Sequence, residues 1–208
     1  QTLYNIALFP VLAALPGTIA AASWTMGRGD PALLGVAEGA LSDQPKLLWS
    51  FKSDGPVRSS AAITTNTVFI GSNDGSLYAL GLSDGKKLWA FKAGGEIKSS
   101  PVIVGDRVLI GSYDETLYCL SVRDGSVRWR FKTNGPVHTT PSIADGMAFI
   151  AGCDQLFRAI RLSDGKEMFN VPSGDYTAAS PALRGGVAYY GTFGNEVLGV
   201  NLQQKQVV

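Results

Sequence analysis

Three titratable side chains recur at one position of a repeating pattern. Arg58, Lys98 and His138 lie 40 residues apart, each just before a pair of hydroxyl residues, and Ala178 breaks the series. If the strand that follows them is innermost, the three would ring the mouth of a channel and attract an anionic ligand or an acidic peptide. The alternative is a solvent-exposed position, where Arg and Lys are common. His138 is the only histidine, so no second one can join it in a metal site.

Aspartates recur in the same way, at Asp74, Asp114 and Asp154, with Gly194 at the fourth position. A calcium site needs several oxygen ligands that converge on one point. The spacing instead puts each carboxylate on a different unit. We therefore expect each aspartate to accept hydrogen bonds from the backbone amides of its own turn.

Paired hydroxyls are candidate nucleophiles only where a base lies beside them, and one histidine cannot serve every pair. The pairs are Ser59–Ser60, Ser99–Ser100 and Thr139–Thr140. We expect these small residues to lie near a crowded axis where strands converge.

The two cysteines, Cys119 and Cys153, lack the spacing of a metal site. Cys119 replaces Ala79 at a strand position, which predicts a small buried residue. Cys153 falls in a turn. A disulfide between the two stays open as an alternative in an oxidising compartment.

All of these residues belong to a repeat of 40 residues. Its clearest landmark is an aromatic residue, present as Trp49, Trp89, Trp129 and Phe169. A large ring at one register, close to a glycine in the same unit, suits docking between adjacent sheets. Phe169 indicates that the position needs a ring rather than an indole hydrogen bond.

Each unit is predicted to form four antiparallel strands, which in the second unit lie near 99–103, 107–111, 116–122 and 127–132. Asp-Gly pairs separate the last two strands, and in two-residue hairpins such pairs are favoured because both positions need positive φ. The pairs are Asp84–Gly85, Asp124–Gly125 and Asp164–Gly165.

Four-stranded antiparallel units that repeat in this way predict an all-β fold, a β-propeller whose blades stack around an axis. Four blades are visible of an expected seven or eight. We expect the last unit to lack its outer strand and the propeller to continue beyond residue 208.

The composition excludes one class of partner. The formal net charge is +1, without the basic excess typical of proteins that bind nucleic acid.

The first segment has no charged residue before Arg28. An apolar stretch followed by alanines predicts that residues 1–22 are a secretory signal peptide or, alternatively, a membrane anchor. A buried structural segment is a third alternative. Residues 23–45 are then a lead-in segment and residues 46–208 the propeller. Either of the first two interpretations places the protein in the periplasm or outside the cell, with membrane association through the N-terminal segment as one alternative.

The motif SDGKKLW, with the Ser-Ser-Pro strand and the V-x-I-G-S-x-D pattern, resembles the repeats of pyrroloquinoline-quinone-like β-propellers. The resemblance covers residues 46 to 208. The lead-in from Trp24 to Leu41 is similar to a segment that, in secreted bacterial members, helps to close the ring and hide free sheet edges.

The family includes non-catalytic scaffolds of the BamB type and dehydrogenases that hold the quinone with calcium. The dehydrogenases carry a pair of adjacent cysteines, which this sequence lacks. The resemblance therefore favours an extracytoplasmic scaffold that binds a protein or peptide, with no catalytic residues and no cofactor. The alternatives are a quinone- and calcium-dependent dehydrogenase and a sensor domain of a larger signalling protein.

Overall fold

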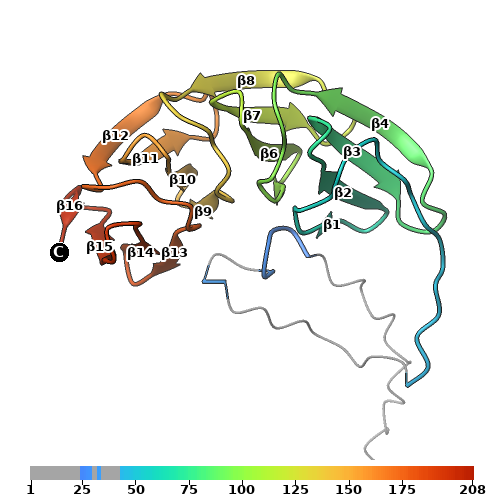
Figure 1. Cartoon of the computed structure of the whole chain (residues 1–208), viewed down its shortest axis with the longest axis horizontal. Coiled ribbons are helices and arrows are strands. Elements are labelled where there is room, and N and C mark those ends of the chain that lie inside the picture. Colours follow the sequence, from blue (N-terminus) through green and yellow to red (C-terminus); the bar gives the residue numbers. More distant parts are fainter. Residues whose placement is uncertain (1–23, 30–31, 34–42) are drawn as a thin grey trace, which may run out of the picture.

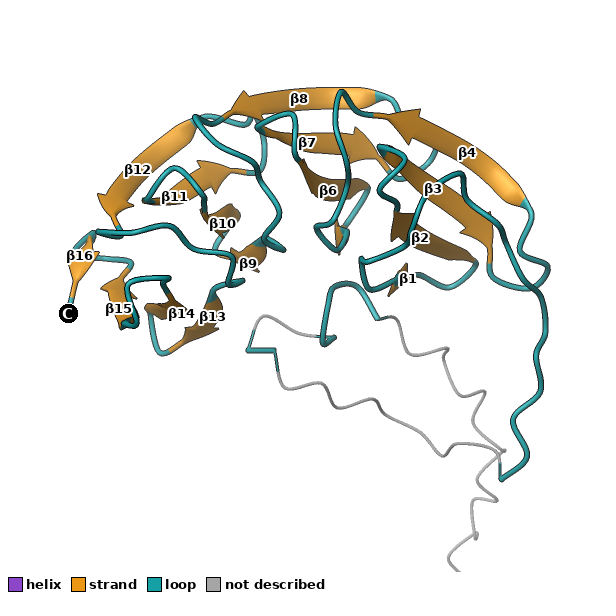
Figure 2. Cartoon of the chain, in the orientation of Figure 1, coloured by secondary structure: helices purple, strands orange, loops and turns teal. Residues whose placement is uncertain are grey.

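The computed structural model describes residues 24–29, 32–33 and 43–208. Every regular element there is a β-strand, and the strands form four separate four-stranded antiparallel sheets (Figures 1 and 2). The described residues contain no helix that could cross a lipid bilayer. The predicted signal peptide or anchor at residues 1–22 lies outside the described residues.

Within each sheet the four strands follow one another in chain order, so four consecutive strands form one blade. The first blade contains β1 (Ala62–Ile63), β2 (Thr67–Gly71), β3 (Ser76–Gly81) and β4 (Lys87–Lys92). The second contains β5 (Val102–Val104), β6 (Arg107–Ser112), β7 (Thr116–Ser121) and β8 (Val127–Lys132). The third contains β9 (Ser142–Ala144), β10 (Met147–Ala151), β11 (Leu156–Arg161) and β12 (Glu167–Pro172). The fourth contains β13 (Ala182–Arg184), β14 (Val187–Gly191), β15 (Val197–Asn201) and β16 (Gln206–Val207).

The four blades lie side by side along an arc, with β4, β8 and β12 on its convex rim (Figure 1). The prediction of an all-β propeller built from four-stranded blades is confirmed. One detail is wrong, because the fourth unit does have an outer strand. That strand, β16, pairs with β15 through only two residues.

Stacking of the blades explains the burial pattern along the strands. Every residue of β3 and β7 is buried. The first and third blades cover β7, whereas β3 packs on the second blade with one face and on Trp49 and Phe51 with the other. The rim strand β4 alternates between exposed and half-buried residues, as expected where one face meets solvent. The core is therefore a series of layers between blades. One such layer packs Phe69 and Leu77 of the first blade with Ile110 and Leu120 of the second.

The first described residues of the lead-in segment, 24–26, lie along the inner strands. Trp24 and Ile63 exchange two backbone hydrogen bonds of 3.0 and 2.7 Å, and the amide of Ile103 donates to the carbonyl of Thr25 at 2.7 Å. The Met26 side chain is 2% exposed and packs into the core between the second and third blades. Residues 24–26 therefore cover inner strand edges of the first two blades.

Candidate functional site

The antiparallel order of the strands gives the arc two faces. One carries the loops that connect successive blades, such as residues 93–101 and 133–141, together with the turns between the second and third strands; we call it the loop face. The other carries the two remaining turns of each blade, and we call it the turn face. Lys98 and His138 lie in the inter-blade loops, and Arg58 lies at the equivalent position in the segment before β1.

The structure joins two of these three residues through a tyrosine. The ammonium of Lys98 lies over the Tyr113 ring, 3.9 Å from its centroid. The Tyr113 hydroxyl shares a hydrogen bond of 3.0 Å with Nδ1 of His138. We call Lys98, Tyr113 and His138 the loop-face cluster. Because Lys98 and Tyr113 belong to the second blade and His138 leads into the third, the cluster bridges two blades.

The expected ring of three cations is weaker than the sequence indicates. Burial lowers the pKa of His138, and the positive charge of Lys98 lowers it further, so the imidazole is neutral near pH 7. Lys98 forms an ion pair of 2.6 Å with Glu96. Arg58 is exposed, and no carboxylate in the described part of the chain lies within ion-pair distance of it. The loop face is thus polar and aromatic. Of Arg58, Lys98 and His138, Arg58 is the one whose positive charge has no carboxylate partner among the described residues.

Further contacts extend the cluster in both directions. Asn73 donates to Glu96 at 3.4 Å, and Sγ of Cys153 lies 3.9 Å from Nε2 of His138. Sequence reasoning missed Tyr113 and Glu96, although Tyr113 shares its register with Asn73 and Cys153. The sequence did hold a clue at this register. Its residue differs from repeat to repeat while the neighbouring residues recur, and such a position is free to form a contact specific to one blade.

Both cysteines are free thiols. Cys119 is fully buried, and burial raises the pKa of its thiol to about 11. Burial and the nearby Asp154 also raise the pKa of Cys153. Neither thiol is activated as a nucleophile, because both stay protonated at neutral pH.

The paired hydroxyls form a ladder between blades. The amide of Ser60 donates to Oγ of Ser100 at 2.9 Å, and the amide of Ser100 donates to Oγ1 of Thr140 at 3.2 Å. The amide of Thr140 in turn donates to Oγ of Ser180 at 2.9 Å. We call these four residues the hub ladder. Their side chains satisfy backbone amides at the inner end of each blade.

The recurring aspartates reach further than their own turns. Only Asp74 accepts from an amide within its turn, that of Ser76 at 2.7 Å. The other bonds cross to the preceding inter-blade loop, from the amides of Asp54, Gly94 and Asn134. The expectation of purely local turn caps is therefore too narrow. Each carboxylate ties a turn to a loop.

A side chain four residues later braces each of these carboxylates. The hydroxyls of Tyr78 and Tyr118 donate to Asp74 and Asp114 at 2.7 and 2.6 Å. In the third blade Arg158 replaces tyrosine and forms ion pairs of 2.7 Å with Asp154 and 2.9 Å with Glu167. Each carboxylate therefore has protein donors, although the buried Oδ1 of Asp114 has no hydrogen-bond partner. In the described residues, no three His, Cys, Asp or Glu side chains gather as a metal site would need.

The Asp-Gly turns have another geometry than the one predicted. Only the glycine has positive φ, at 68° for Gly85, 72° for Gly125 and 73° for Gly165. Each connection spans five residues, and its aspartate accepts from the amide two residues on, as Asp84 does from Lys86 at 3.1 Å. A two-residue turn with positive φ at both positions does occur in the third blade. It lies at Asp145 (48°) and Gly146 (72°), between β9 and β10.

The tryptophans dock against these glycines. A Cβ atom at Gly85, Gly125 or Gly165 would lie 2.5 to 2.7 Å from the ring of Trp49, Trp89 or Trp129. Each indole also donates a hydrogen bond to a carbonyl 33 residues later, such as Trp89 to Val122 at 3.1 Å. The expectation that no indole hydrogen bond is needed is therefore wrong for all three tryptophans. At the fourth junction Lys205 replaces the glycine, and its ammonium lies 5.6 Å from the centroid of the Phe169 ring.

The repeats match one family model, described as outer membrane protein assembly factor BamB, over residues 39–117 and 95–208. No curated protein matches the chain. Among solved structures, BamB from Moraxella catarrhalis is similar with a TM-score of 0.68 and 16% identity, covering 77% of this chain and 53% of that one. The chain therefore spans about half the length of that relative.

Two computationally designed proteins have similar structures. Ika4 has a TM-score of 0.66 and 13% identity, with 76% of this chain and 99% of that chain covered. Ika8 has a TM-score of 0.62 and 16% identity, with 71% and 46% covered. At these identities the structural neighbours establish the fold alone.

Proposed function

This chain belongs to the propeller family described as outer membrane protein assembly factor BamB, and on that premise we propose that it is an extracytoplasmic scaffold that binds a protein or peptide partner. The observation that carries the proposal is the loop-face cluster. It is a set of aromatic and polar side chains that are already held in place on an accessible face. Binding there needs no chemistry from this chain.

Preorganisation is what makes the cluster suited to binding. The Tyr113 ring is fixed on one side by Lys98 and at its hydroxyl by His138, so little side-chain entropy remains to be lost on docking. Tyrosine and arginine are the residue types that contribute most at protein interfaces. Exposed apolar side chains follow along the same face, among them Val57, Tyr176 and Phe193, which are 51%, 52% and 67% exposed.

A photo-crosslinking amino acid at Arg58 tests the loop face directly, because this side chain is exposed and forms no ion pair with any other described residue. We expect a discrete crosslinked adduct in cells that express the full protein, and none from Lys87 on the rim strand β4. Tyr113→Ala, with the crosslinker at Val57, is expected to weaken the adduct about tenfold. Equal adducts from Arg58 and Lys87, or an unchanged yield with Tyr113→Ala, would show that the partner docks elsewhere.

Residues 1–22 are proposed to direct export or to anchor the protein. A fusion of the chain to alkaline phosphatase, which is active only outside the cytoplasm, tests this in a bacterial host. We expect activity from the full-length fusion and its loss when residues 1–22 are removed. Activity without these residues would argue against the proposal. Fractionation of the active fusion then separates a cleaved signal peptide from a retained membrane anchor.

The proposal that the protein binds a partner without catalysing a reaction is tested by adding pyrroloquinoline quinone, calcium and an alcohol to the full protein and following dye reduction. We expect no turnover above that of the Lys98→Ala, Asp154→Asn double variant. Robust turnover by the unaltered protein alone would contradict the scaffold proposal.

A further inference from the structure

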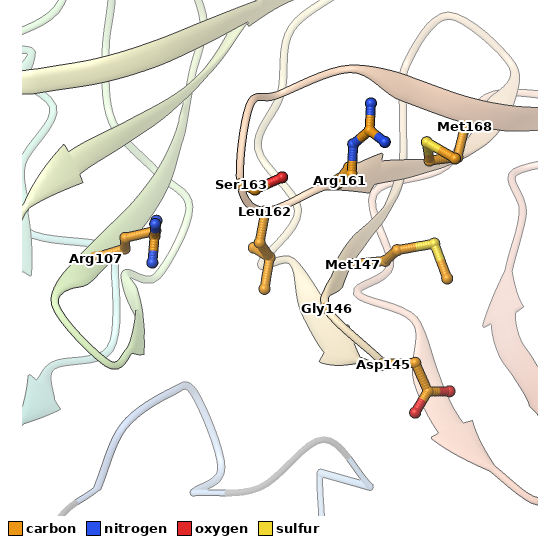
Figure 3. Close-up of a pocket in the computed structure, with 8 residues that line it drawn as sticks. All are labelled: Arg107, Asp145, Gly146, Met147, Arg161, Leu162, Ser163 and Met168. Atoms are coloured by element: carbon orange, nitrogen blue, oxygen red, sulfur yellow. The ribbon is translucent and has the colours of Figure 1, made fainter.

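A second candidate surface lies on the turn face, between the second and third blades. It is a groove of about 590 Å³ in a size range suited to ligands. Met147, Leu162 and Met168 supply its apolar part, with Arg107 across from them on the second blade (Figure 3). Both flanking blades belong to the described chain, so the groove lies within the arc and not at one of its ends.

The neighbouring junction shows why the groove is open. At the registers of Met147 and Met168 the second blade has Arg107 and Arg128. Those two guanidiniums share Asp106, at 3.0 and 2.6 Å, so ion pairs occupy the equivalent place. The third blade has Gly146 at the register of Asp106 and thus lacks all three charged groups. Two flexible thioethers take their place, and methionine is over-used at surfaces that bind varied partners.

The charges around the groove select one kind of occupant. Arg107 and Arg128 have one carboxylate between them, which leaves one positive charge uncompensated on the Arg107 side. The buried Nε of Arg107 has no hydrogen-bond acceptor, and an unsatisfied buried donor is costly. Arg161 is neutralised by Asp164 at 2.9 Å.

The other end of the groove has the opposite sign. Asp145 lies on a different side from Arg107 in Figure 3, and it would repel a second acid. A ligand with one carboxylate therefore fits in one orientation only. Its acid faces Arg107, and its apolar side chain lies against the two methionines.

From this arrangement we propose that the groove binds an extended peptide segment in which an acidic residue adjoins a large apolar one. Its apolar side chain packs on Met147, Leu162 and Met168, and its carboxylate accepts from Arg107. This site is separate from the loop-face cluster and lies on the opposite face. With both faces occupied, the propeller holds two partners at once.

Methionine methyl NMR tests the proposal, because the chain has three methionines and two of them line the groove. The third, Met26, is 2% exposed in the core and serves as the internal reference. The probe is a capped octapeptide with a central Glu-Leu pair, and the matched controls carry Glu-Ser or Lys-Leu. We expect the Met147 and Met168 signals to move with the Glu-Leu peptide while Met26 stays. An absence of shifts, or equal binding of the Lys-Leu peptide, would overturn the proposal.

The second blade suggests a variant that tests the groove. Met168→Arg installs the residue that the second blade has at this register, at a side chain that is 46% exposed, so the fold is expected to persist. Peptide affinity, measured by fluorescence anisotropy, is expected to fall about tenfold. The Arg58 crosslink should be unchanged. Unaltered affinity with Met168→Arg would overturn the groove site, whereas loss of the Arg58 adduct in the unaltered protein bears only on the loop face.

Discussion

The second and third blades share one backbone plan but place their charges differently. In the second blade the ion pairs that Arg107 and Arg128 form with Asp106 lie on the turn face, where the side chains of Arg128 and Asp106 are 37% and 61% exposed. In the third blade Met147 and Met168 take the places of Arg107 and Arg128, and Arg161 pairs with Asp164 beside them. The other arginine of the third blade, Arg158, lies inside, where its side chain and that of Asp154 are 5% and 4% exposed.

This contrast teaches that the repeat determines where the strands lie but not which side-chain hydrogen bonds and ion pairs hold them together. Where Tyr118 braces Asp114 with one neutral donor, Arg158 braces Asp154 with two charged ones and also holds Glu167. The third blade therefore depends on a buried charge network. The second depends on a neutral donor at the same place, and its surface pairs contribute little because solvent screens them.

The largest expected effect comes from removing the buried cation. Arg158→Leu leaves Asp154 buried without a counter-charge and should cost about 3–5 kcal/mol in the free energy of unfolding. Urea denaturation of the full chain measures this loss. Arg158→Tyr is the matched control, because tyrosine occupies this register in the first two blades. Equal losses for the two variants would show that burial of the carboxylate is not the cause.

A smaller loss is expected at the junction where Trp129 of the second blade docks on Gly165 of the third. Gly165→Ala combines positive φ with a Cβ atom 2.7 Å from the indole, and should cost about 2–4 kcal/mol. Gly174→Ala is the control, because φ there is 75° but nothing lies within 4 Å. We expect it to cost about 1–2 kcal/mol. Thermal unfolding of both variants separates steric contact from backbone strain.

Acid should weaken the third blade through Asp154. Burial raises the pKa of this carboxyl, but the donors of Arg158 and Asn134 outweigh it and hold the pKa below its usual value. A folded-state pKa that is lowered contributes stability above about pH 4, and that stability is lost as the pH falls through the folded pKa. Unfolding measured against pH should therefore be steeper for the unaltered chain than for Asp154→Asn. Parallel curves would contradict this assignment.

The smallest effect is expected at the exposed pairs of the second blade. Arg128→Ser removes one of the two partners of Asp106 and should change stability by no more than about 1 kcal/mol. Urea denaturation at low and high salt checks both the size and its screening. A loss as large as that of Arg158→Leu would erase the distinction between the two blades.

The 40-residue period made the strands predictable, because buried middle strands and glycine turns recur at fixed positions. The predicted strand at 107–111, for example, is β6 at Arg107–Ser112. The site was less predictable because its contacts run between repeats. Tyr113 meets His138 25 residues later, and the period gives no sign of such a pair. The methionine groove depends on what Met147 and Met168 lack relative to the second blade, which a search for recurring residues passes over.

The prediction of two-residue turns at the Asp-Gly pairs between the third and fourth strands was wrong for a local reason. An Asp-Gly pair fits both a two-residue and a five-residue connection, and strand register decides between them. Docking of Trp129 against Gly165 accompanies the longer connection, whereas Asp145–Gly146 meets no such ring and forms the tight turn.

The hub ladder has a consequence for how such a protein can change length. The amides of Ser60, Ser100 and Thr140 each donate to the hydroxyl of the residue 40 positions further along the chain. If a whole unit is duplicated or deleted, the amide-to-hydroxyl bond forms with the next copy, and no backbone amide loses its acceptor. Gene-level gain or loss of single blades is therefore tolerated at the hub, whereas an insertion of any other length there would break the alignment.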